Sequence, residues 1–264
     1  MQPMLNIALR AARSAGELIY RSMERLDVLT VNEKEANDYV SEIDRAAEQT
    51  IINHLRKTYP DHGFHAEESG FQPGQGEGAD IVWIIDPLDG TSNYVHGDTT
   101  YSVSIALTRG GETILGVVHD PVVNQMYWAT EGGKAYMNDE QLSVSWHASI
   151  ENGYIGFGIP YSLNQQGEQI LQRALKQFRK ASFRIKGSAA LDLCYVAAGV
   201  TDAFFHSGLS PWDVAAGAFI LIQAGGTCTD FSGGDRFVFA REMVASNGKI
   251  HEEIMKEIVG MDQA

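Results

Sequence analysis

The chain has 264 residues, 44% of them hydrophobic, and its 34 acidic side chains outnumber its 20 basic ones, which gives a formal net charge of −14. A surface of that sign repels the phosphates of nucleic acids and of anionic lipids, so we expect neither as a direct partner. No apolar run reaches the roughly 18 residues that a membrane span needs, and the opening MQPMLNIALRAARSAG lacks the continuous apolar core of a signal peptide.

The first 145 residues contain two helical patterns followed by a series of strands. Apolar residues recur at helical spacing over residues 4–24 and again over 41–59, where Pro60 ends the pattern. Strand patterns follow at HGFHA, at residues 81–85, 101–108 and 113–119, and at QMYWA and QLSVS. The segment RGGE predicts a hairpin, and the polar, glycine-rich segment EESGFQPGQGEGAD predicts a loop. Residues 1–145 are therefore expected to combine helices with a mixed, largely antiparallel sheet.

Residues 146–264 change to an alternation of strands and helices. Strands are predicted at YIGFGI, SFRIK, AFFH, TCTDF and MVASN, and helices at residues 164–180, SAALDLCYVAAG, WDVAAGAFILIQAGG and residues 250–259. The whole chain, residues 1–264, is expected to be a layered α/β protein whose two halves pack into a single domain.

Four further residues are assigned to the core. Trp83 and Trp212 flank acidic residues, and both are interpreted as packing residues. Cys194 and Cys228 lie in apolar stretches, which favours buried free thiols in a reducing cytoplasm over a disulfide. The eight histidines show no H-x-x-x-H spacing, so a zinc site is not expected.

Acidic side chains stand at the ends of several predicted elements: Glu67 and Glu68, Asp86 and Asp89, Asp213, and Asp44. Strand ends open onto loops, where the chemistry of α/β folds tends to be located. Taken singly, each group has an ordinary explanation, because D-P-x-D is common in turns, a lone aspartate often caps a helix, and a Glu-Glu pair is often solvated.

The turn after the strand IVWII favours a metal site, because it can bring two of the acids together. Pro87 and Gly90 force a turn that lets Asp86 and Asp89 face one cavity and leaves the carbonyl of Leu88 free. Several carboxylates together with a backbone oxygen are the ligands that a hard divalent cation prefers. Without a cation, clustered acids would repel each other.

Three segments, AEESG, WIIDPLDGTSN and PWDVAAGA, together resemble the signature segments of the inositol monophosphatase family. These are magnesium-dependent, lithium-sensitive phosphatases of small phosphorylated polyols and sugars. The resemblance runs from the first helix to about Asn247, and the opening of the chain is most similar to the bacterial SuhB-type branch. It implies alternating α-β-α-β-α layers, a cytoplasmic homodimer and, for that branch, a second role as partner of the transcription antitermination machinery.

The resemblance also implies which residues bind the metal ions. Glu67, Asp86 and the carbonyl of Leu88 would bind a first Mg²⁺, while Asp86, Asp89 and Asp213 would bind a second. Glu67 with water molecules would hold a weaker third ion. Two metal ions about 3.5–4 Å apart lower the pKa of the attacking water and stabilise the leaving oxygen, which suits the hydrolysis of a phosphate monoester.

Further roles follow from the same resemblance. Thr91 and Asp44 correspond to a hydrogen-bonded pair that helps to activate the attacking water, so together with Glu67 they are assigned as catalytic. The amides of Gly90 and Thr91 would face the phosphate oxygens, next to Asp89 and Asp213. The segment that lines the alcohol portion of the substrate corresponds to Gly187, Ser188 and Ala189.

One position departs from the family pattern. Inositol-specific members have an acid seven residues before the second signature aspartate, and here that residue is His206. It is interpreted either as a neutral histidine at a strand end or as part of an altered substrate pocket, since histidine donates as well as accepts. The substrate is expected to be inositol monophosphate or a related polyol or sugar phosphate. Fructose 1,6-bisphosphate, histidinol phosphate and 3′-phosphoadenosine 5′-phosphate are the alternatives.

Overall fold

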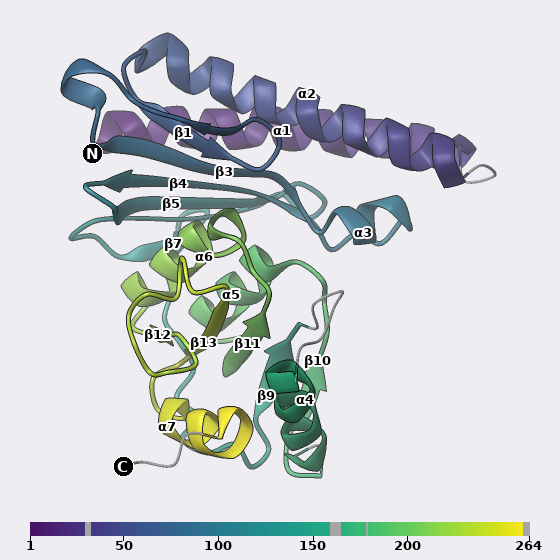
Figure 1. Ribbon diagram of the computed structural model, residues 1–264, viewed down its shortest axis with the longest axis vertical. Coiled ribbons are helices and arrows are strands. Elements are labelled where there is room, and N and C mark those ends of the chain that lie inside the picture. The colour runs from purple at the N-terminus through teal and green to yellow at the C-terminus, as the bar shows by residue number, and fades with distance from the viewer. Residues whose placement is uncertain (30–32, 159–164, 178, 261–264) are drawn as a thin grey trace.

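The computed structural model describes residues 1–29, 33–158, 165–177 and 179–260, and it stacks helices and sheets in alternating layers (Figure 1). The layers are, in order, helices α1 (Gln2–Leu29) and α2 (Glu33–Thr58), an eight-stranded sheet, helices α5 (Ala189–Ala197) and α6 (Pro211–Gln223), a five-stranded sheet, and helices α4 (Gln165–Gln177) and α7 (His251–Ile254). A π-helical turn, Met255–Val259, continues α7. This is the α-β-α-β-α order expected from the sequence.

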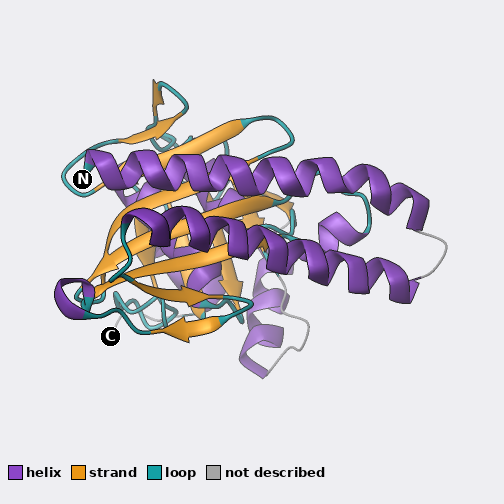
Figure 2. Cartoon of the chain, turned by 90° about the horizontal axis from the view of Figure 1, so that it is seen from above, coloured by secondary structure: helices purple, strands orange, loops and turns teal. Residues whose placement is uncertain are grey.

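Helices α1 and α2 lie side by side across one face of the larger sheet (Figure 2). The helical spacing of apolar residues explains this position, because Leu5, Ala8 and Ala12 of α1 and Ile51 and Leu55 of α2 are all buried on the side that faces the sheet. Both helices begin earlier than the apolar pattern predicts, and α1 also extends further at its C-terminal end. No helix in the described ranges is long and apolar enough to cross a membrane.

The larger sheet consists of β1 (Gly63–Ala66), β2 (Gly70–Gln72), β3 (Ile81–Asp89), β4 (Ser102–Arg109), β5 (Glu112–Asp120), β6 (Gln125–Thr130), β7 (Ala135–Met137) and β8 (Glu140–Gln141). Its strand order is β2-β1-β3-β4-β5-β6-β7-β8, and β1 and β3 are its parallel pair, while all other neighbours are antiparallel. The strands in the middle are buried on both faces, because helices cover both sides of the sheet.

Two expectations for this half are corrected by the structure. The predicted loop EESGFQPGQGEGAD contains strand β2 and a 3₁₀ turn, Gly76–Gly78. Strand β2 has no apolar alternation, since Phe71 is exposed, and it is held by backbone pairing with β1 around the left-handed Gly70. The predicted strand QLSVS is reduced to Glu140–Gln141.

The smaller sheet consists of β9 (Tyr154–Phe157), β10 (Ser182–Arg184), β11 (Ala203–Ser207), β12 (Thr227–Thr229) and β13 (Glu242–Ser246), in the order β10-β9-β11-β13-β12. Helices α5 and α6 separate it from the larger sheet and are apolar on almost every side because they are covered from both. Cys194 and Cys228 are buried free thiols, as predicted. Trp83 is fully buried, and its indole N–H lies 3.1 Å from Nδ1 of His62.

Candidate active site

The exit of strand β3 departs from regular pairing. The register between β3 and β4 shifts between Asp86 and Asp89, and both residues are nevertheless buried. Gly90 follows with φ +100°, and a Cβ there would lie 2.8 Å from the carbonyl oxygen of Thr100, so the position requires glycine. The short helix α3 (Thr91–Val95) starts at once. This turn directs the acids at the end of β3 away from the sheet and toward the layer of α5 and α6.

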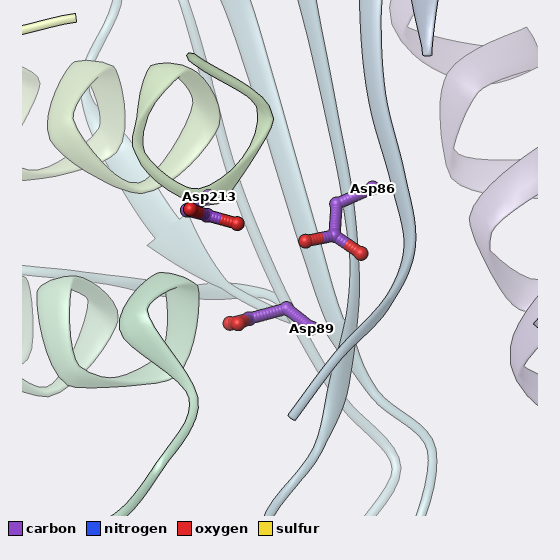
Figure 3. A group of neighbouring side chains, drawn as sticks. All are labelled: Asp86, Asp89 and Asp213. Carbon is purple, nitrogen blue, oxygen red and sulfur yellow. The ribbon is translucent and has the colours of Figure 1, made fainter. Parts of the chain in front are cut away.

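Asp86, Asp89 and Asp213, which we call the aspartate cluster, converge on a common space. Each offers a carboxylate oxygen, and these oxygens lie within 4.8 Å of one another. Figure 3 shows the three side chains pointing toward each other, Asp86 and Asp89 from the end of β3 and Asp213 from the start of α6. The fold therefore brings together acids that are far apart in the sequence.

The carboxylates of the aspartate cluster are oriented by hydrogen bonds from the protein itself. Asp86 Oδ1 accepts from the Leu88 amide at 2.9 Å, and Asp213 Oδ2 accepts from the Ser210 amide at 2.6 Å. Three donors at the start of α5 reach Asp89, namely the hydroxyl of Ser188 at 2.6 Å and the amides of Ala189 at 3.3 Å and Ala190 at 2.8 Å. Ser188 and Ala189, expected to line the substrate, thus also position Asp89.

A cavity of about 450 Å³ opens beside the aspartate cluster. All the predicted site residues but one line it: Glu67, Asp86, Leu88, Asp89, Gly90, Thr91, Gly187, Ser188, Ala189, His206 and Asp213. Trp212 also lines the cavity, in edge-to-face contact with His65, so it contributes to the site as well as to packing. The exception is Asp44, which is buried in α2 away from the cavity wall.

Two predicted interactions differ in the structure. The carbonyl of Leu88 is not free, because the hydroxyl of Thr91 donates to it at 2.9 Å. The hydroxyl can reach back because Thr91 stands three residues further along the same tight turn. No hydrogen bond joins Thr91 to Asp44 in the part of the chain that the structure describes, and Asp44 Oδ1 has no partner there.

In the described part of the chain the acids around the cavity form no salt bridges, although the charge of Arg241 acts on Asp213 and opposes the rise in its pKa. Burial raises the pKa of Asp89 to about 7, and the charge of Asp213 adds to the effect. Burial also raises the pKa of Glu67 to about 7 and that of Asp44 to about 8, and it raises the pKa of Asp86 well above its usual range. Neither of the two salt bridges found among the described residues involves these acids. A set of converging carboxylates without a salt bridge to a basic side chain fits a hard divalent cation such as Mg²⁺.

His206 lies at the end of β11 and lines the cavity, where burial lowers its pKa to about 4 and keeps the imidazole neutral. Another residue that lines the cavity, Asp192, was not predicted from the sequence. It is 2% exposed and stands in the middle of α5, whose other buried residues are all apolar. An acid inside an otherwise apolar helix was the signal that could have found it.

The sequence matches the inositol monophosphatase family over residues 1–263. Among curated proteins, it is 51% identical over 263 residues to "Nus factor SuhB" of Pseudomonas aeruginosa, a match that covers 98% of this chain and 96% of the relative. It is 42% identical over 251 residues to "Nus factor SuhB" of Escherichia coli K12, which covers 95% of this chain and 93% of the relative.

Solved structures of the same kind share the fold. The extragenic suppressor protein suhB from Bartonella henselae superposes with a TM-score of 0.85 at 34% identity, covering 96% of this chain and 98% of the other. An IMPase from Thermotoga maritima superposes with a TM-score of 0.83 at 35% identity, covering 98% and 97%. The resemblance seen in the signature segments and the layered fold are both confirmed.

Proposed function

Since the chain belongs to the inositol monophosphatase family, we propose that it is a Mg²⁺-dependent phosphomonoesterase acting on inositol monophosphate or a related small polyol or sugar phosphate. The observation that supports this most is the convergence of Asp86, Asp89 and Asp213 beside a cavity of about 450 Å³. A cavity of that size suits a small phosphate ester.

The aspartate cluster and Glu67 would hold the metal ions. Bound Mg²⁺ supplies positive charge that offsets the carboxylates and the phosphate and lowers the pKa of a bound water. The carbonyl of Leu88 has a second lone pair besides the one that Thr91 occupies, so it remains able to act as a ligand.

The residues of the chain supply orientation and proton transfer. Glu67 and Thr91 line the cavity, where Glu67 would accept a proton from the attacking water and the hydroxyl of Thr91 would orient that water by accepting a hydrogen bond from it. The amides of Gly90 and Thr91 are assigned to the phosphate oxygens. Asp44 does not line the cavity, so we assign it an indirect effect, through its charge on Asp86.

A second function is favoured by the names of the relatives. The Pseudomonas aeruginosa protein is called a Nus factor, and it matches almost the whole chain at 51% identity. We therefore propose that this chain also binds a component of the transcription antitermination machinery, as a cytoplasmic homodimer, and that this role does not need the metal ions.

Release of inorganic phosphate from a panel of esters, with and without Mg²⁺, tests the first proposal. The panel contains inositol 1-phosphate, glycerol 2-phosphate, fructose 1,6-bisphosphate, histidinol phosphate and 3′-phosphoadenosine 5′-phosphate. We expect Mg²⁺-dependent release, fastest from the polyol esters and inhibited by Li⁺, and release from none of them would overturn the phosphatase proposal. Pull-down of antitermination factors by wild type and by Asp213→Asn tests the second, since equal capture would separate it from catalysis.

A further inference from the structure

One wall of the cavity holds two polar atoms that the protein does not satisfy. The wall, which we call the α5–β11 wall, is formed by Asp192, Phe204 and His206. Asp192 Oδ1 and His206 Nδ1 are buried and have no hydrogen-bond partner in the described part of the chain. In the described part of the chain, six buried side-chain atoms have no hydrogen-bond partner. Asp192 and His206 are the two residues among their owners that line the cavity. A buried polar atom without a partner is costly, so these two are placed for a ligand to complete.

Other polar side chains of the cavity are already used. The hydroxyl of Ser188 donates to Asp89, and that of Thr91 donates to Leu88. The amide of Asn93 donates to the carbonyls of Thr100 and Lys186, both at 2.7 Å. Outside the aspartate cluster, therefore, the α5–β11 wall offers the buried polar groups that a substrate can engage.

Asp192 differs from a buried acid with a structural role. Asp202, 8% exposed, accepts hydrogen bonds from the hydroxyl of Ser145 at 2.5 Å and the amide of Tyr154 at 2.8 Å. Asp192 is more deeply buried, yet no described residue donates to its carboxylate. The charge of Lys186 acts on Asp192, but the ammonium group lies over the ring of Tyr195, with Nζ 3.7 Å from the ring centroid.

Two glycines of the β9 segment hold the wall in place. A Cβ at Gly156 would lie 3.3 Å from Asp192 Oδ1, and a Cβ at Gly158 would lie 1.7 Å from Cδ2 of His206. Residues two apart in an extended segment point to the same side. The absence of two side chains on that side leaves the space in which Asp192 and His206 lie, against the backbone.

We propose that Asp192 and His206 together bind the hydroxyl groups of the alcohol portion of the substrate, with Asp192 as the main acceptor. A carboxylate accepts two hydroxyl hydrogen bonds, whereas a neutral imidazole accepts one and donates one, so the pair suits an alcohol with at least two neighbouring hydroxyl groups. The inference rests on the proposed phosphatase function and narrows its substrate class to polyol phosphates. The acid that recognises the polyol stands on helix α5, and His206 occupies the strand position.

The test compares Asp192→Asn with Asp202→Asn, two buried acids changed in the same way. We measure kcat/KM for inositol 1-phosphate and for phenyl phosphate, an ester whose alcohol portion has no free hydroxyl. Asp192→Asn should lower the ratio of the two values by roughly ten- to a hundredfold, mainly through KM, because one of the two acceptor oxygens that the substrate hydroxyls need is replaced by an amide donor. Asp202→Asn should leave the ratio unchanged. An unchanged ratio in Asp192→Asn would overturn the inference.

Melting temperatures give a second readout that does not depend on turnover. Asp192→Asn should melt no lower than wild type, because it replaces a buried carboxyl group that has an unpartnered oxygen with an amide of the same size, whereas Asp202→Asn loses two hydrogen bonds and should melt lower. Addition of myo-inositol should raise the melting temperature of wild type but not that of Asp192→Asn. Equal shifts in both, including none, or a destabilisation of Asp192→Asn as large as that of Asp202→Asn, would refute the role of the wall. Failure of wild type to release phosphate from either ester would instead refute the phosphatase proposal.

Discussion

The aspartate cluster and the α5–β11 wall face the same cavity, but the protein treats their polar groups in opposite ways. Asp86, Asp89 and Asp213 each accept a hydrogen bond from a backbone amide of the chain. Asp192 and His206 are left with unpartnered atoms. The difference indicates that the chain fixes its acids in advance where several ligands must meet one ion, and leaves the wall to be completed by the substrate itself.

The largest effect is expected from breaking the aspartate cluster. Asp213→Asn keeps the side-chain volume but removes a negative charge, so we expect kcat to fall by roughly a hundredfold or more, as when transition-state charge loses its partner. Asp230→Asn is the matched control, because Asp230 is also buried and hydrogen-bonded but lies outside the cavity. Steady-state kinetics at saturating Mg²⁺ check this, and near-wild-type turnover of Asp213→Asn would remove Asp213 from the set of metal ligands.

A smaller effect is expected from adding an acidic side chain to the α5–β11 wall. His206→Glu adds a charged acceptor beside Asp192, so KM for inositol 1-phosphate should fall by about tenfold, or ~1.4 kcal/mol. Glycerol 2-phosphate, which offers fewer hydroxyl groups, should change much less. His206→Gln is the control, since an amide both donates and accepts as imidazole does. Equal changes for both substrates would mean that His206 acts through the metal site or the fold.

The packing of the wall can be disturbed by changing a glycine beside it, without replacing Asp192 or His206. Gly158→Ala would place a methyl group 1.7 Å from the His206 ring, so the ring must move. Overpacking of this kind costs about 1–3 kcal/mol, which lowers the melting temperature by roughly 2–4 °C per kcal/mol in a chain of this size. The cost should be smaller in a His206→Ala background. A double-mutant cycle by thermal melting checks this, and identical costs in both backgrounds would contradict the contact.

The aspartate cluster and the place of His206 beside it were predictable from the sequence, but Asp192 was not. Asp86, Asp89 and Asp213 lie in contiguous segments with a strong local signal, and strand ends bring such segments together. Asp192 was hidden because its neighbours in α5 read as core, and a helical pattern does not say which buried position faces a cavity. The Thr91 hydrogen bond to Leu88 depends on side-chain rotation in one tight turn, which no periodicity encodes.

The secondary-structure elements also divide into those that their own residues predict and those that depend on contacts with other elements. Helices α1 and α2 and strands β3 to β5 carry apolar spacing that predicts them, because their faces are buried. Strand β2 has an exposed phenylalanine and is fixed by pairing with β1, which is a tertiary cause outside its own residues. Helices α1 and α2 exceed the apolar pattern at their ends, because apolar spacing does not mark where a helix begins or stops.

The central claim is that the acids around the cavity bind a divalent cation, and this makes the stability of the protein depend on pH. Folding raises the pKa of Asp44 to about 8 and those of Glu67 and Asp89 to about 7, from ordinary values of 3.8 to 4.5. The folded protein therefore binds more protons than the unfolded chain between about pH 4 and pH 8, and without metal its stability falls as the pH rises through that window. Protons and Mg²⁺ compete for the same carboxylates, so the metal should stabilise more at higher pH.

Thermal melting with Mg²⁺ or with EDTA, at about pH 6 and at about pH 8, measures this most directly. We predict that the EDTA-treated protein melts at a lower temperature at pH 8 than at pH 6. Saturating Mg²⁺ should raise the melting temperature at both pH values, more at pH 8, and should raise it less in Asp213→Asn. A melting temperature that ignores Mg²⁺ and EDTA at both pH values would contradict the assignment of these acids to a metal site.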